Sequence, residues 1–291
     1  MSAQPSQQQA DAYMFPPGSA LPQITRELAL LLGGGRALLL QLAHPLIAAG
    51  VADHSRFQDA PQARLERTLD LMLTLSLGTW EAGRPMLRRF HAVHGPIVGR
   101  LAAAAGPFAA GTPYSADDPA LRLWVAATLL DTSLRGYELF VGPLSLQRRL
   151  AFYADSSVFA RRLGITAAAW PPTLGAFEAY MQAMLTSDVL TVTPTARRLA
   201  HEVLHPQGVG PPARAGAGLL GWVAAGMLPP RLRRAYGLRW TARQAARLRR
   251  GAWLGRHLLP LLPSGLRYVP QAGGPRLVEW LLRQGRGTAL H

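Results

Sequence analysis

The sequence predicts an all-α protein that forms a single large domain. Capping signals for helices recur along the 291 residues, whereas alternating apolar and polar runs and Asn-Gly turns, which mark strands and hairpins, are absent. Apolar residues make up 49% of the chain and charged residues only 16%, which indicates a globular protein with a large buried core.

The helices of the first half follow from their capping residues. The letters DAP at 59–61 predict a helix over 61–77, because proline fits the first helical turn and a glycine follows the last one. A second helix is expected over 80–98. An Asp-Pro pair at 118–119 caps a long helix predicted over 119–140.

The second half of the chain continues the same pattern. Ser145, Thr193 and Thr241 each precede an apolar-periodic run, so each is a predicted N-cap. Loops rich in glycine and proline are expected at 106–113, 170–173 and 206–218.

Charge divides the chain at the last of these loops. Up to residue 205 the sequence holds 17 Arg and 15 acidic residues, and from 206 onward it holds 14 Arg and one acidic residue. We therefore expect a disordered N-terminal tail over 1–22, a helical core over 23–205 and an Arg-rich C-terminal helical part of the same domain over 206–291. Such a basic part is typical of contact with an anionic partner, and equally of a solvated helix face.

Two amino acids are missing from the chain, and their absence excludes several chemistries. Without cysteine there are no disulfides, thiolate nucleophiles, iron–sulfur clusters or thiolate-ligated haem. Without lysine there is no Schiff-base or P-loop chemistry. The first residues show no signal-peptide pattern, and no stretch has the ~20 apolar residues of a membrane span. We expect a soluble cytoplasmic protein, with the membrane surface as an alternative location.

The letters HEVLH, from His201 to His205, match the H-E-x-x-H pattern of zinc metallopeptidases. The two histidines share one helix face, and Glu202 would serve as the general base. A proline ends the helix at once, and His257 and Glu279 are the nearest candidates for a third ligand. A zinc hydrolase is therefore an alternative function, beside an ordinary amphipathic surface helix.

The most informative segment is 84–100, which carries a histidine within an apolar stripe. Spacings of three, four and three residues place on one helix face Leu87, Phe90, His94 and Ile97. His94 is therefore expected to point inward, and His91, on a neighbouring stripe with two arginines, outward. An inward histidine is either a core residue that forms hydrogen bonds or a metal ligand.

Polar side chains on the preceding segments form two further candidates. Arg64, Arg67 and Thr68 share one face of a helix, where two guanidinium groups and a hydroxyl can bind haem propionates or another anion. The alternative is an exposed basic face. His44 is flanked by leucines, so it is expected to be buried and either to line a pocket or to bond a nearby carbonyl.

These blocks, in this order, resemble the catalytic domain family of the MpaB oxygenases and the latex-clearing rubber oxygenases. Arg64-x-x-Arg67-Thr68 resembles the family's Arg-x-x-basic-Thr block. His91-Ala92-Val93-His94 resembles the block that carries the proximal haem histidine, a role that falls on His94. The other matching blocks are 33–45, 50–55, 113–116, 118–119, 123–125, 137–144 and 228–233. The resemblance runs from about residue 28 to residue 270.

The resemblance implies a globin-like helical bundle, haem b as the cofactor and O₂ as a co-substrate. His94 would ligate the iron, and Arg64, Arg67 and Thr68 would bind the haem and, with His44, act in catalysis. Characterised members cleave isoprenoid double bonds. The function implied is therefore a haem-dependent oxygenase that acts on an apolar, isoprenoid-like small molecule.

The chain departs from the family pattern at three positions. The lysine that can serve as a distal ligand in rubber oxygenases falls at Arg67, which cannot deprotonate to bind iron. Ala126 stands where many close relatives carry histidine, and Asp53 is the nearest counterpart of the carboxylate proposed there as a base.

A non-enzymatic alternative is a basic helical protein that binds anionic lipid. Specific binding of nucleic acid is not expected, because no recognition motif occurs.

Overall fold

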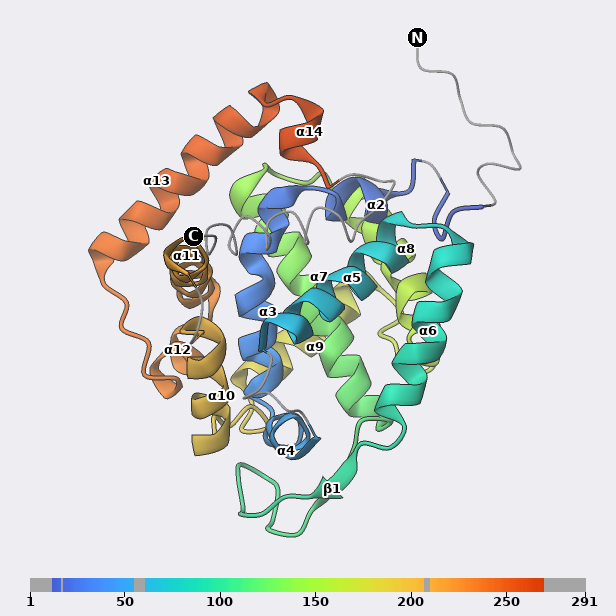
Figure 1. Ribbon diagram of the computed structural model, residues 1–291, viewed down its shortest axis with the longest axis vertical. Coiled ribbons are helices and arrows are strands. Elements are labelled where there is room, and N and C mark those ends of the chain that lie inside the picture. Colours follow the sequence, from blue (N-terminus) through green and yellow to red (C-terminus); the bar gives the residue numbers. More distant parts are fainter. Residues whose placement is uncertain (1–11, 17, 55–60, 207–209, 270–291) are drawn as a thin grey trace, which may run out of the picture.

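The all-α prediction is confirmed by the computed structural model, which describes residues 12–16, 18–54, 61–206 and 210–269. The side chains of 61–67, 212 and 213 lie outside this description. Helices dominate the described residues, which also contain one two-stranded sheet (Figure 1).

Helices follow one another with short connections. In the N-terminal half they are α2 (Ala20–Thr25), the 3₁₀ helix η1 (Leu28–Gly33), α3 (Gly34–Leu42), α4 (Pro45–His54), α5 (Pro61–Leu77) and α6 (Trp80–His94). After the sheet come α7 (Pro119–Phe140), α8 (Leu146–Arg162), α9 (Leu174–Thr186), α10 (Pro194–Leu204), α11 (Pro211–Met227), α12 (Pro230–Ala235), α13 (Ala242–Leu258), the 3₁₀ helix η2 (Leu259–Leu261) and α14 (Ser264–Arg267).

The capping residues predicted from the sequence hold the starts of four helices. The Asp118 carboxylate accepts the backbone N–H groups of the first turn of α7. Ser145, Thr193 and Thr241 accept a backbone N–H at the starts of α8, α10 and α13 in the same way. Each cap satisfies donors that the helix itself cannot pair. The predicted bounds of α5 and α7 are also confirmed.

Two predicted boundaries are wrong, and proline explains both. Helix α6 ends at His94 instead of near residue 98, because Pro96 cannot donate a backbone hydrogen bond and Ile97 already leads into a strand. The loop expected over 206–218 is mostly the helix α11, which begins at Pro211, since proline suits the first helical turn.

The N-terminal tail was expected to be disordered over 1–22, and this is wrong for its second half. Met14 and Phe15 are buried in the main core, and α2 begins at Ala20. The carbonyl of Met14 accepts a bond from Arg162 of α8, 148 residues away. These contacts give the segment buried area that offsets the entropy lost on ordering. Residues 1–11 lie outside the described part of the chain.

Helix α7 forms the centre of the fold, because α3, η1, α8, α9 and α13 all pack against it (Figure 1). Buried side chains therefore occur on several sides of α7 and not on one stripe. The indole of Trp124 is fully buried and donates to the carbonyl of Leu40, which ties α7 to α3. The main core also includes side chains from α11 and α12, so the Arg-rich C-terminal part packs on the same core.

The three glycines at 33–35 bring η1 and α3 close to their neighbours. A Cβ at Gly33 would lie 2.8 Å from Cγ2 of Thr132 in α7, and a Cβ at Gly35 would lie 3.0 Å from Cβ of Ala224 in α11. A side chain at either position would force its neighbour to move, so glycine suits both approaches.

Arg36 follows the glycines and is 1% exposed. Its guanidinium donates to Asp131 at 2.5 Å, to Thr132 at 2.6 Å and to the carbonyl of Met227 at 3.1 Å. A buried charge is tolerated when it is paired and its donors are satisfied, and this side chain meets both conditions. Arg36 thereby joins α3 to α7 and to the end of α11.

One hairpin interrupts the helices. Strands β1 (Val98–Arg100) and β2 (Pro113–Ser115) pair antiparallel, with Gly99 opposite Tyr114. A Cβ at Gly99 would overlap the hydroxyl oxygen of Tyr114, so the Tyr114 ring covers this glycine.

No single helix among the described residues is long and apolar enough to cross a membrane. A bent pair, Leu28–Leu42 with Pro45–His54 at an angle of 101°, meets that test by length and composition only.

Candidate functional site

His94 is the last residue of α6 and is half-buried. Its Nδ1 lies 2.8 Å from the backbone carbonyl of Phe90, one helical turn earlier, and its ring centroid lies 4.1 Å from that of Phe90. A carbonyl can only accept, so Nδ1 carries the proton and Nε2 keeps its lone pair. This is the tautomer that a histidine needs to bind a metal through Nε2.

The expected contrast between an inward His94 and an outward His91 is wrong, because both side chains are half-buried. The turn after α8 lies over His91: a Cβ at Gly164 would lie 3.3 Å from Cε1 of that ring. This contact joins segments more than 70 residues apart, so the periodicity of α6 alone could not indicate it. Phe90 separates the two imidazoles, with its centroid 5.3 Å from that of His91.

The Arg-x-x-Arg-Thr block lies in the first half of α5, which packs against α6. The two helices leave their connection in different directions, so the start of α5 and the end of α6 lie apart in Figure 1. Thr68 is exposed. The side chains of Arg64 and Arg67 lie outside the described part of the chain, so their place beside His94 stays a prediction.

His44 lies in the sharp bend between α3 and α4 and is 5% exposed, which confirms the predicted burial. Its ring centroid is 5.2 Å from that of Phe108, and its buried Nδ1 has no hydrogen-bond partner among the described residues. Burial lowers the pKa of His44 to about 4, although the charge of Asp118 opposes the shift. The imidazole is therefore neutral at pH 7.

The segment between α6 and α7 connects the surroundings of the two histidines. A Cβ at Gly95, next to His94, would lie 3.9 Å from a carboxylate oxygen of Asp117. The next residue, Asp118, is the carboxylate whose charge acts on His44. Phe108, from the same segment, packs against His44 with the two ring planes tilted by 39°. The two histidines thus belong to one end of the molecule, where α4, the hairpin and the end of α6 meet (Figure 1).

Asp53 accepts a hydrogen bond from the hydroxyl of Tyr114 at 2.5 Å. The bond ties α4 to β2, and burial together with this carboxylate raises the pKa of the Tyr114 hydroxyl. The neighbouring His54 places Nε2 2.8 Å from the carbonyl of Val98 in β1. Both contacts hold the hairpin against α4. Asp53 therefore has a structural role, and no contact in this arrangement supports a role for it as a catalytic base.

The histidines of the H-E-x-x-H block lie at the end of α10 with their ring centroids 4.8 Å apart. Glu202 between them forms a weak ion pair with Arg198 at 3.9 Å. Among the described residues no group of three His, Asp or Glu side chains gathers to hold a metal, here or elsewhere. The zinc alternative therefore lacks a third ligand in this part of the chain.

Two open pockets lie along the C-terminal half of α7, and the sequence did not indicate either. The larger, of about 440 Å³, lies between α7, α11 and α13, and the smaller, of about 220 Å³, between α7, α8 and α9. Arg135 and Glu138 of α7 line both of them. Asp131 lines the smaller pocket, and an acidic residue in the apolar middle of a predicted helix indicates a buried partner in another helix, here Arg36.

The fold is that of an all-α protein, and two of its histidines, His44 and His94, lie at one end of the molecule. The family described as ER-bound oxygenase mpaB/B'/Rubber oxygenase, catalytic domain, matches residues 22–257, and the chain belongs to this family.

Two similar proteins are uncharacterized proteins of Mycobacterium bovis and Mycobacterium tuberculosis. Each is 29% identical over 260 residues, a match that covers 87% of this chain and 95% of the relative. No solved structure shows significant similarity to the chain.

Proposed function

We propose that this protein is a haem b-dependent oxygenase that acts on an apolar, isoprenoid-like small molecule with O₂. Membership of an oxygenase family supports the class of reaction. The observation that carries the haem is the place of His94 in the block that resembles the family's proximal haem histidine, and the hydrogen bond from its Nδ1 to the Phe90 carbonyl sets the matching tautomer.

The composition of the chain also supports this cofactor. Without cysteine, histidine is the strongest donor for haem iron, and Arg64 and Arg67 would pair with the two propionates. Bound haem supplies the one-electron chemistry that activation of O₂ needs. The Phe90 carbonyl orients the His94 ring. His44, neutral at pH 7, is the proposed catalytic side chain, because its buried Nδ1 can form a hydrogen bond without bringing in charge.

Haem titration of the purified protein tests the cofactor. We expect a Soret band at one haem per chain in the wild type, its loss in His94→Gly, and its recovery when imidazole is added to that variant. His257→Gly is the matched control, because His257 has the same Nδ1 contact, 2.7 Å from the carbonyl of Trp253, on an exposed helix face. A wild type that binds no haem, or a His94→Gly spectrum equal to that of the wild type, contradicts the proposal.

Oxygen uptake by the haem-loaded protein with squalene tests the substrate class. Cleavage of one carbon–carbon double bond by one O₂ gives two carbonyl groups, so both atoms of ¹⁸O₂ are expected in the products. His44→Leu is expected to lower the rate and to keep the Soret band. Haem binding without uptake of oxygen would refute the substrate class and leave the cofactor assignment standing.

A further inference from the structure

Apolar side chains are unusually exposed at the C-terminal end of the described chain. Six of the eleven large apolar residues that are exposed among the described residues fall within 14 positions. We call this group the C-terminal apolar strip, and its members are Trp253, Leu254, Leu258, Leu261, Leu262 and Leu266. Their exposed fractions range from 39% to 77%. Single exposed apolar residues are normal on a protein surface, whereas a contiguous group marks an interaction site.

Helix α13 explains how the strip arises. A capping box of Thr241 and Gln244 begins the helix, and its inner face buries Leu248 and Ala252 against α7 and α11. The helix lies at the edge of the molecule in Figure 1, and the side chains on its outer face are exposed among the described residues. Because α13 has 3.6 residues per turn, positions 254 and 258 share that outer face, and η2 and α14 continue the apolar run.

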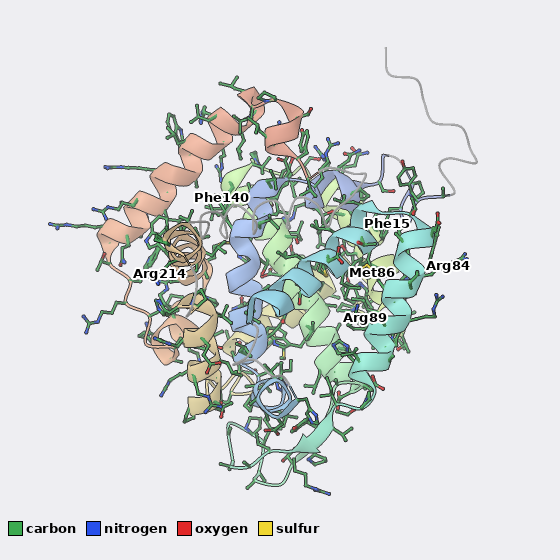
Figure 2. The ribbon with its side chains drawn as sticks, viewed as in Figure 1. Phe15, Arg84, Met86, Arg89, Phe140 and Arg214 are labelled. Atoms are coloured by element: carbon green, nitrogen blue, oxygen red, sulfur yellow. The ribbon has the colours of Figure 1, made fainter. Side chains whose placement is uncertain are left out.

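Arginines border the strip on the same helix. Arg243, Arg247 and Arg250 lie on the outer face of the first half of α13 and are exposed. Figure 2 shows side chains with nitrogen ends that extend from this helix away from the body of the molecule. No ion pair among the described residues neutralises these three arginines, and the sequence has no acidic residue between positions 203 and 278.

We propose that α13, η2 and α14 form a docking surface for an anionic lipid bilayer. The apolar strip would enter the boundary between headgroups and acyl chains, and the arginines would contact lipid phosphates. Charge favours this partner over a second copy of the chain, which would bring the same 11 Arg of residues 206–269 against them. Exposed leucines favour a bilayer over a nucleic acid, whose phosphates offer them no apolar partner.

Co-flotation with extruded vesicles tests the surface on the full chain. One set of vesicles contains phosphatidylcholine alone, and the other contains phosphatidylcholine and phosphatidylglycerol at 70:30. We expect the wild type to float with the anionic vesicles and to stay in solution with the neutral ones. Each arginine near the membrane surface contributes roughly a fivefold change in partition, so Arg247→Gln with Arg250→Gln is expected to weaken binding about 25-fold.

The apolar strip and the controls are tested in the same assay. Leu258→Gln with Leu266→Gln removes side chains that are 51% and 64% exposed and is expected to weaken binding about tenfold. Its matched control is Leu146→Gln with Leu150→Gln on α8, where the leucines are 66% and 48% exposed.

The charge control is Arg84→Gln with Arg88→Gln on α6, on the opposite side of the molecule, where Arg84 points outward (Figure 2). Both control pairs are expected to leave binding unchanged.

The proposal is overturned if the wild type does not float, if it binds neutral vesicles equally well, or if the control variants lose as much binding. It is also overturned if substitution of the apolar strip abolishes self-association of the protein in analytical ultracentrifugation and leaves vesicle binding unchanged. Tight binding of a DNA duplex that the leucine substitutions leave intact would identify a nucleic-acid surface and also overturn it. The assay needs neither haem nor turnover, so its failure leaves the proposed oxygenase function untouched.

Discussion

His44 predicts that the protein loses stability when the pH falls from 7 to 5. The imidazole is 5% exposed, and burial lowers its pKa to about 4, whereas histidine in an unfolded chain titrates near 6.5. The unfolded state therefore binds more protons than the folded state between these values. Stability from this group is fully present above pH 6.5 and is lost as the pH falls toward 4.

The size of the effect follows from the two pKa values. At pH 5 the unfolded histidine is almost fully protonated and the folded one is mostly neutral, so the free energy of unfolding falls by about 2 kcal/mol relative to pH 7. Leucine at this position cannot titrate and has a similar volume. It would also remove the buried Nδ1 that lacks a hydrogen-bond partner.

Urea unfolding of the wild type and of His44→Leu at pH 7 and pH 5 measures this difference. Carboxylates and the other histidines titrate in both proteins and cancel in the comparison, so the wild type is expected to lose about 2 kcal/mol more than the variant. His257→Gln, on an exposed face, is the control and is expected to behave like the wild type. An equal loss in the wild type and in His44→Leu would refute the assignment of a buried, neutral imidazole.

Two further predictions concern the core. Asp131→Asn leaves the buried Arg36 without its counter-charge and is expected to lower the free energy of unfolding by about 3–5 kcal/mol. Asp188→Asn breaks an ion pair whose carboxylate is 89% exposed, so it should change stability by less than about 1 kcal/mol, and equal effects would contradict the argument. Gly33→Ala is expected to cost about 1–3 kcal/mol in chemical denaturation, because its Cβ would meet α7 at 2.8 Å. Gly216→Ala, where nothing lies within 4 Å, should instead add about 0.5–1 kcal/mol, and a loss there would show that the site is not open.

Family membership and helix starts followed directly from local sequence. Side-chain caps act within three residues, so Asp118 and Thr241 indicate the starts of their helices without any tertiary contact. Proline is a further local signal for helix boundaries, since Pro96 ends α6 and Pro211 begins α11. The burial of His44 was also readable, because leucines flank it on both sides.

The candidate site was predicted only in part. His94 was selected by its place in an apolar stripe and by the family block, and its Nδ1 contact with Phe90 is itself local, one turn apart. The partial burial of His91 could not be predicted from the sequence, because the turn that covers it comes from the end of α8. The tie between Asp53 and Tyr114 likewise spans 61 residues and depends on how the hairpin packs against α4.

Local sequence is enough to indicate the helical class, the starts of six helices, the excluded chemistries and the basic character of the C-terminal part. These depend on composition or on contacts within a few residues. Only the packing of distant helices pairs Arg36 with Asp131 across 95 residues, forms the pockets beside α7 and leaves the outer face of α13 exposed among the described residues. The physical reason is that helical periodicity fixes which side chains share a face, whereas only the packing of distant helices fixes which faces are buried.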